Sequence, residues 1–284
     1  MNTTRCLVAA IALCSVSSLA RSQEPTGLTI AWEKNYLTIR GDFPGREIKI
    51  HYLEAYCRPG STDREWRDTV IRHTAELLDS PAGGKLIKLR DKLTDGVTVE
   101  HTITAKTDEI DFHLRAHNPT ATASQAHWAQ PCIRVDQFTG TTKDDARTLV
   151  PAYARKCFLF LDGQLTRLPT TPWADKARYI PGQVYCPPGV DRNDVNPRPL
   201  SPLVPSSGLC GCFSADERQI MAVAWSPYQE IFQGVAVCLH SDFRLGGLVP
   251  GQSKTIRGKI YIVPADIKQL VARYERDFPE QSSK

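Results

Sequence analysis

The sequence predicts an all-β protein, a large antiparallel β-sandwich with one α-helix at its C-terminus. Three observations predict this fold. Apolar and polar residues alternate with a period of two through residues 86–118, as in a sheet with one buried face. Turn-forming residues recur roughly every ten residues along the rest of the chain, which is typical of a sandwich with many strands. Only residues 265–278 combine an apolar stripe at helical spacing with an acidic residue, Asp266, suited to a first helical turn.

The alternating segment predicts a three-stranded meander. Gly96 in the left-handed conformation gives a three-residue turn that places Leu93 opposite Val97. At the second turn, apolar residues stay on the apolar face when Ile103 lies opposite Phe112. Shifting either register by one residue would turn polar side chains into the core, so the pattern fixes both pairings.

Two polar pairs follow from this register. Glu100 lies opposite Arg115 on the polar face, where we expect a cross-strand ion pair. Asp91 and His101 fall on the apolar face, diagonal to one another. They are interpreted either as a hydrogen-bonded polar pair in the core or at a sheet end, or as a pair that faces a ligand on a concave sheet.

The remaining elements are expected from shorter patterns. Residues 69–78 fit a strand or a helix, and their β-branched start favours a strand. Seven prolines between Pro181 and Pro205 exclude regular elements there and indicate a functional or covering loop. With no repeat or linker, residues 23–284 are expected to form a single β-sandwich domain. The other expected strands are residues 27–40 (a hairpin), 47–56, 132–138, 156–161 with 164–168 (a second hairpin), 209–213, 220–225, 230–240 and 255–263.

Residues 1–22 have the pattern of a secretory signal peptide. Arg5 supplies the charge, residues 6–16 the apolar run, and small residues around Ala20 a cleavage site. The apolar run is too short to span a membrane. We therefore expect a secreted or periplasmic mature protein without membrane insertion.

Charge gives no sign of a nucleic-acid partner. The net charge is +4 for the full chain and +2 once Arg5 and Arg21 are removed with the signal peptide, and no basic run stands out. The mature chain keeps seven cysteines, an odd number, so at least one thiol is free or paired between chains. We expect most of them to be buried as small apolar residues. They are Cys57, Cys132, Cys157, Cys186, Cys210, Cys212 and Cys238.

Metal and cofactor motifs are weak. Cys210-Gly-Cys212, together with His240, suggests a metal site, but a lone Cys-x-Cys without a spaced second pair is a weak signal. No glycine-rich phosphate loop occurs. The sequence therefore predicts neither a metal nor a cofactor.

Three short motifs carry a resemblance to a known family. Residues 114–120 (Leu-Arg-Ala-His-Asn-Pro-Thr) end a strand in an Asn-containing turn, His127 and Trp128 follow, and residues 248–251 (Leu-Val-Pro-Gly) precede the closing strand. This order resembles the galactose-mutarotase-like family of carbohydrate-active β-sandwich proteins, the supersandwich fold. The chain is also similar to an uncharacterised group of secreted bacterial proteins related to that fold. The resemblance implies a catalytic histidine on a concave sheet face, at His127.

Acid–base chemistry on a sugar needs an acid and a carboxylate base. The pKa of a histidine lies near neutrality, so His127 is the candidate acid toward a ring oxygen. Glu230 and Asp242, near ends of late strands, are the candidate bases. The alternatives are a loop histidine hydrogen-bonded for structure and two ordinary surface carboxylates.

Sugar binding needs flat apolar faces and planar hydrogen-bonding groups. Trp128, Trp173, Trp225 and Tyr228 are the candidates for stacking, with core packing as the alternative, and Trp128 and Trp173 are favoured because they lie beside loops. Residues 240, 242 and 244 would point the same way in a strand. The candidate substrate-binding residues are Trp128, Trp173, Arg192, Asp194, His240 and Arg244.

The sequence thus supports two functions. The first is a secreted protein that binds a mono- or oligosaccharide, with epimerase-like proton transfer centred on His127. The second is a non-catalytic binding or structural module of an exported assembly. The first requires His127, a carboxylate and a tryptophan to converge in one cleft, and the second predicts an exposed apolar patch instead.

Overall fold

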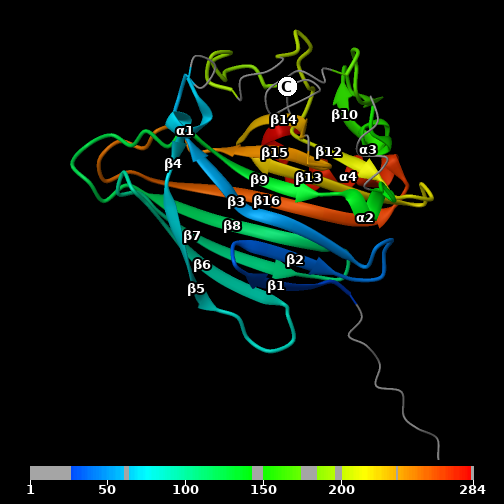
Figure 1. The fold of residues 1–284 in the computed structure, drawn as a ribbon, viewed down its shortest axis with the longest axis horizontal. Coiled ribbons are helices and arrows are strands. Elements are labelled where there is room, and N and C mark those ends of the chain that lie inside the picture. Colours follow the sequence, from blue (N-terminus) through cyan, green and yellow to red (C-terminus); the bar gives the residue numbers. More distant parts are fainter. Residues whose placement is uncertain are drawn as a thin grey trace, which may run out of the picture.

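The computed structural model describes residues 27–60, 64–142, 150–173, 184–195, 200–234 and 236–282. Within these residues the chain forms two antiparallel sheets that pack face to face, with a helix near the C-terminus (Figure 1). This confirms the predicted β-sandwich with a C-terminal helix. The predicted signal peptide, residues 1–22, lies outside the described residues. Among the described helices, none is long and apolar enough to cross a membrane.

The smaller sheet has seven strands in the order β1-β2-β3-β9-β15-β14, with β4 paired to β3. These strands are β1 (Thr29–Glu33), β2 (Tyr36–Arg40), β3 (Glu47–Cys57), β4 (Val70–Ile71), β9 (Trp128–Arg134), β14 (Tyr228–Gly234) and β15 (Cys238–Arg244). Its strands come from both ends of the chain, so distant segments are brought side by side.

The larger sheet has nine strands in the order β11-β10-β12-β13-β16-β8-β7-β6-β5. These strands are β5 (His73–Asp79), β6 (Leu86–Leu93), β7 (Thr98–Ala105), β8 (Glu109–His117), β10 (Cys157–Leu161), β11 (Gln164–Arg167), β12 (Cys210–Phe213), β13 (Gln219–Ser226) and β16 (Ser253–Pro264). The short helices are α1 (Trp66–Thr69), α2 (Asp136–Thr139), α3 (Ala152–Lys156) and α5 (Pro279–Ser282), and the longer α4 is Ile267–Asp277.

The meander has the predicted register. Ile103 pairs with Phe112 and Glu100 with Arg115 across β7 and β8. Gly96 has a φ of 94°, and the Leu93 amide donates to the Val97 carbonyl. The predicted ion pair is wrong, because the Glu100 carboxylate binds Arg90 on β6 at 2.9 Å, while Arg115 donates to Ser253.

Aromatic side chains join the two sheets across the core. The rings of Tyr52 and Phe243 belong to the smaller sheet, and those of Phe112 and Trp225 to the larger one. Their centroids form a chain, with 5.7 Å from Tyr52 to Phe112, 5.1 Å from Phe112 to Trp225 and 4.8 Å from Trp225 to Phe243. All four residues are buried, so the apolar faces of both sheets form one core.

The polar pair Asp91 and His101 lies within this core with its hydrogen bonds made. His101 Nε2 lies 3.2 Å from the Asp91 carboxylate, and Tyr56 donates to the same carboxylate at 2.6 Å. Tyr52 Oη lies 2.8 Å from His101 Nδ1. Because every partner is buried between the sheets, the structure supports the first interpretation, a hydrogen-bonded core pair.

Three element boundaries differ from expectation. The strand expected at 132–138 begins at Trp128 and ends at Arg134, and one helical turn, α2, follows it and ends at Gly140, which has a φ of 69°. The single strand expected at 230–240 is a hairpin, β14 and β15. Residues 69–78 are mainly strand, as favoured, after the short helix α1.

All seven mature cysteines are buried free thiols, as expected for small apolar residues. Helix α4 covers the outer face of the larger sheet, where Leu270 and Tyr274 pack against Phe158, Ile220 and neighbouring residues. Its N-terminal residue Asp266 caps the helix by accepting a hydrogen bond from the Gln269 amide.

An ion-pair cluster around Glu109 fastens α4 to β8 and β16. Lys106 and Lys259 each reach the Glu109 carboxylate at 2.7 Å, and Arg273 of α4 also donates to it. Burial raises the pKa of Glu109, but these three cations outweigh burial and lower it from 4.5 to about 2. A lowered pKa in the folded state means that the ionised carboxylate stabilises the fold above pH 4.5 and that this stabilisation is lost as the pH falls toward 2.

We predict that Glu109→Gln lowers the free energy of unfolding by on the order of 2 kcal/mol at pH 7, because it leaves the largely buried Lys259 and Arg273 with fewer partners. The loss should shrink as the pH falls below 4.5. Denaturant titration at several pH values measures it. Glu76→Gln, which removes an exposed pair with Lys92, is the control and should change stability by less than about 0.5 kcal/mol. An equal loss at pH 7 and at low pH would contradict the assignment.

Candidate functional site

The outer face of the seven-stranded sheet carries most of the predicted site residues. Strand alternation turns Ile231, Leu239 and Phe243 into the core and their neighbours outward. On the outer face Glu230 pairs with Asp242, and Arg244 pairs with Trp128 of β9. Strands β14, β15 and β9 are adjacent in the sheet (Figure 1), so Glu230, Asp242 and Arg244 lie along one polar strip of this face.

A covering segment, residues 184–195, lies over this face. The backbone of Tyr185 exchanges two hydrogen bonds with Ile231 of β14, at 2.9 and 2.8 Å. Val184, Val190 and Val195 pack against Phe232. The described part of the proline-rich stretch is therefore a covering loop, as the sequence indicated, and it buries the polar strip beneath it.

His127 and Asp194 meet where the covering segment ends. His127 Nδ1 lies 2.9 Å from the Asp194 carboxylate, and Arg244 donates to the same oxygen at 3.1 Å. Arg244 also donates to Gln229 Oε1 at 2.6 Å, and the Gln229 amide donates to the Asp194 carbonyl. We call His127, Asp194, Arg244 and Gln229 the histidine cluster. It joins the covering segment to β14, β15 and the start of β9.

Backbone contacts hold His127 in place. Its amide donates to Cys57 at 2.9 Å, and its carbonyl accepts from Leu245 and Gly246 at 2.8 Å each. Gly247 lies against the ring, and a Cβ there would lie 2.7 Å from His127 Nε2. Only glycine, with its φ of 70°, leaves room for the imidazole at this position.

This arrangement gives the two ring nitrogens of His127 different roles. A carboxylate only accepts, so Nδ1 carries the proton in the bond to Asp194. Nε2 then accepts a proton in the neutral ring and donates one in the cation. The side chain of His127 is 25% exposed whereas that of Asp194 is 6% exposed. The histidine is therefore held through Nδ1 by a buried carboxylate, while its side chain as a whole stays partly exposed.

Glu230 and Asp242 are not surface carboxylates. They lie directly opposite each other on β14 and β15, and both are fully buried. Burial raises the pKa of Asp242 to about 7, although the imidazole of His240 acts to lower it. His240 Nδ1 lies 3.6 Å from the Asp242 carboxylate. Buried carboxyl groups are costly, so this strip is a candidate for a functional face.

The other predicted binding residues lie apart from the histidine cluster or offer no free face. Trp128 is fully buried against Ala55 and Cys57, so it presents no ring face for stacking on a sugar. Trp173 packs edge-on against Tyr153, with centroids 6.2 Å apart. Arg192 donates to the Ser201 carbonyl within the covering region. For Trp128 the structure supports core packing, the alternative given above, whereas Trp173 is partly buried at the margin of the core and stays a prediction.

Sequence reasoning missed Gln229 and Gly247. Gln229 is buried with the rest of β14, and the sequence offers no signal that separates it from its polar neighbours Glu230 and Gln233. The role of Gly247 depends on its contact with a ring 120 positions earlier, which no local pattern reveals.

Larger hollows lie elsewhere among the described residues. One of about 710 Å³ is bordered by Leu28, Phe43 and Arg46, and one of about 610 Å³ by Tyr36, Lys49 and Arg134. Neither includes a predicted site residue, whereas a cavity of about 100 Å³ on the outer face is lined in part by His240.

Comparison with known proteins finds similar folds. No protein-family model and no curated protein match the chain. A galactose mutarotase-like protein from Lactobacillus casei is similar with a TM-score of 0.42 and 10% identity, covering 83% of this chain and 100% of that chain. One from Clostridium acetobutylicum has a TM-score of 0.41 and 10% identity, with coverage of 83% and 94%. An alpha-mannosidase from Enterococcus faecalis has a TM-score of 0.46 and 9% identity, with coverage of 90% of this chain and 30% of that chain.

We predict that Gly247→Ala displaces the His127 ring and lowers the free energy of unfolding by about 1 to 3 kcal/mol. Gly251→Ala is the matched control, because Gly251 has a φ of 73° and nothing within 4 Å of its added Cβ. Both variants carry the same backbone strain, so their difference isolates the contact with the ring. Imidazole NMR resonances and denaturant titration measure the two effects. Unchanged His127 resonances in Gly247→Ala would contradict the contact.

Proposed function

We propose that this chain is an exported carbohydrate-binding protein that uses His127 for proton transfer on the bound sugar. The observation that carries the proposal is the histidine cluster. It couples a partly exposed imidazole to a buried carboxylate at the edge of a sheet face rich in planar polar groups. The predicted signal peptide supports export.

The chemistry of the face suits a polyhydroxylated ligand. Sugar hydroxyls both donate and accept, so they pair best with amides, carboxylates and guanidinium groups held in fixed positions. Gln229, Asp194 and Arg244 are such groups, and their mutual hydrogen bonds fix them. A sugar that binds here would replace solvent at the exposed edges of His127 and Arg244.

Proton transfer at the anomeric centre needs an acid for the ring oxygen and a base for the anomeric hydroxyl. His127 Nε2 is the acid in this proposal, because Asp194 supports the imidazolium through Nδ1. Glu230 follows Gln229 of the histidine cluster directly in sequence and is the proposed base. Asp242 is assigned a supporting role toward His240, whose Nδ1 it faces.

The test begins with a glycan array on the mature protein, followed by NMR measurement of anomer interconversion for any aldose that binds. We expect His127→Ala to lower the interconversion rate by roughly 100-fold or more while weakening binding less. His113→Ala is the control, because His113 is 57% exposed on the other sheet, and it should leave both quantities unchanged.

Two results would change the proposal. Sugar binding without interconversion would leave a non-catalytic binding module, the second function considered above. Absence of binding to any glycan, with a folded protein, would overturn the carbohydrate proposal as a whole.

A further inference from the structure

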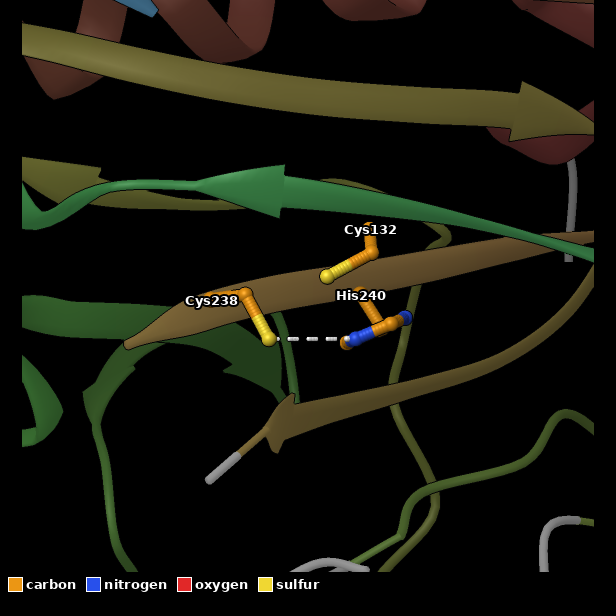
Figure 2. Close-up of side chains that lie close together, drawn as sticks. All are labelled: Cys132, Cys238 and His240. Atoms are coloured by element: carbon orange, nitrogen blue, oxygen red, sulfur yellow. Dashed lines mark hydrogen bonds between the residues drawn. The ribbon is translucent and has the colours of Figure 1, made fainter. Parts of the chain in front are cut away.

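Three metal-ligating side chains converge at the other end of the same sheet face. They are Cys132 of β9 and Cys238 and His240 of β15, and Figure 2 shows the two sulfurs and the imidazole turned toward one another. Their ligand atoms all lie within 4.8 Å of one another, and all three residues are buried. Cys238 Sγ lies 3.3 Å from His240 Nε2.

Strand geometry explains the convergence. Cys238 and His240 are two positions apart on β15, so both point to the outer face. Cys238 pairs with Arg134 and Leu239 with Ile133, which puts Cys132 beside His240 and diagonal to Cys238. Neighbouring strands thus supply three ligands without a dedicated loop.

His240 is oriented as metal-binding histidines are. Its Nδ1 faces the Asp242 carboxylate at 3.6 Å, while its Nε2 faces the sulfurs. Phe232 stacks on the ring, with centroids 4.2 Å apart and an interplanar angle of 10°. At 3.6 Å the Asp242 carboxylate lies beyond hydrogen-bonding distance of Nδ1, so it acts on the ring through its negative charge, which favours a proton on Nδ1 and leaves Nε2 to bind a metal.

The surroundings leave room for an ion and one further ligand. Gly234 lies beside the cluster, and a Cβ there would lie 2.4 Å from Cys238 Sγ and 3.2 Å from His240 Nε2. A cavity of about 100 Å³ opens at the three residues and is also lined by Glu54, Gln130 and Arg134. Glu54 is held there by a hydrogen bond from Gln130 at 3.2 Å.

We propose that Cys132, Cys238 and His240 bind a zinc ion whose fourth position faces this cavity. Two thiolates and one imidazole are a soft, tetrahedral ligand set suited to Zn²⁺. Zinc–ligand bonds of about 2.0 to 2.3 Å put neighbouring ligand atoms roughly 3.5 Å apart, close to the 3.3 Å between Cys238 and His240.

Charge also favours a divalent ion here. Two thiolates balance the charge of Zn²⁺, so the buried complex is neutral, whereas buried thiolates alone would be costly. The fourth ligand is a water, which keeps the complex neutral, and Glu54 lines the cavity that holds it. The sequence analysis missed this site, because it considered Cys210-Gly-Cys212, whereas Cys132 and Cys238 are 106 positions apart in the chain.

The experiment uses the mature chain, purified with a reductant and without chelator. Elemental analysis is expected to find about one zinc per chain. Co²⁺ in place of zinc should give the visible bands of a tetrahedral ion and a sulfur-to-cobalt charge-transfer band in the near ultraviolet. A zinc-dependent rise in Tm that a chelator reverses would support the site in the wild-type protein without any variant.

Variants then assign the ligands. Cys238→Ser and Cys132→Ser should each weaken zinc binding at least 100-fold and reduce the charge-transfer band, and Asp242→Asn should weaken it about 10-fold. Cys212→Ala, a buried thiol of the other sheet, is the control and should bind zinc normally. The proposal is overturned if the reduced wild-type protein neither binds Zn²⁺ nor gains Tm. It is also overturned if the cobalt spectrum is the same in Cys238→Ser, or if the exported protein carries a Cys132–Cys238 disulfide.

Discussion

Packing of the two sheets through Tyr52, Phe112, Trp225 and Phe243 determines which side chains of the seven-stranded sheet face outward. A strand has only two faces, so burying Phe243 in this interface turns Asp242 and its alternate neighbours to the other side. A slip of one residue would bring polar groups into the core and lose the aromatic contacts. The outer polar face is therefore a consequence of the apolar interface behind it.

That outer face would be exposed in a simple sandwich, and here it is covered. Residues 184–195 pack Val184 and Val190 onto Phe232, and Asp194 at their end meets His127 and Arg244. Covering a polar strip has a desolvation cost unless its groups find partners. At one end of the strip, the members of the histidine cluster are hydrogen-bonded to one another. At the other end, the proposed zinc ion would bind two thiols and an imidazole.

Sequence reasoning succeeded where the structure depends on local pattern. The meander, its registers and the helix follow from alternation, one glycine turn and one amphipathic stripe. The β14–β15 hairpin was missed because an apolar sequence forms its turn, in which Val237 adopts a φ of 53° that valine rarely takes. The sequence suggested individual site residues but not their contacts. His127 and Asp194 are 67 positions apart in the chain and come together only when it folds. The ion pair expected between Glu100 and Arg115 does not form. The register of β7 against β8 does not determine whether a cation of β6 or one of β8 pairs with Glu100, and here Arg90 of β6 does.

The two proposed sites lie on the same polar strip and use different residues. His240 was first considered a sugar ligand, but its Nε2 faces Cys238 and its Nδ1 faces Asp242, so both nitrogens are directed away from a ligand at the histidine cluster. Arg244 lies four residues further along β15, about 13 Å away by strand rise. Asp242 lies between them on β15 and faces His240, and its pairing partner on β14 is Glu230. Strand β15 thus presents Arg244 of the histidine cluster at one end and the proposed metal ligands Cys238 and His240 at the other, because the period-two alternation that the core imposes turns all three outward.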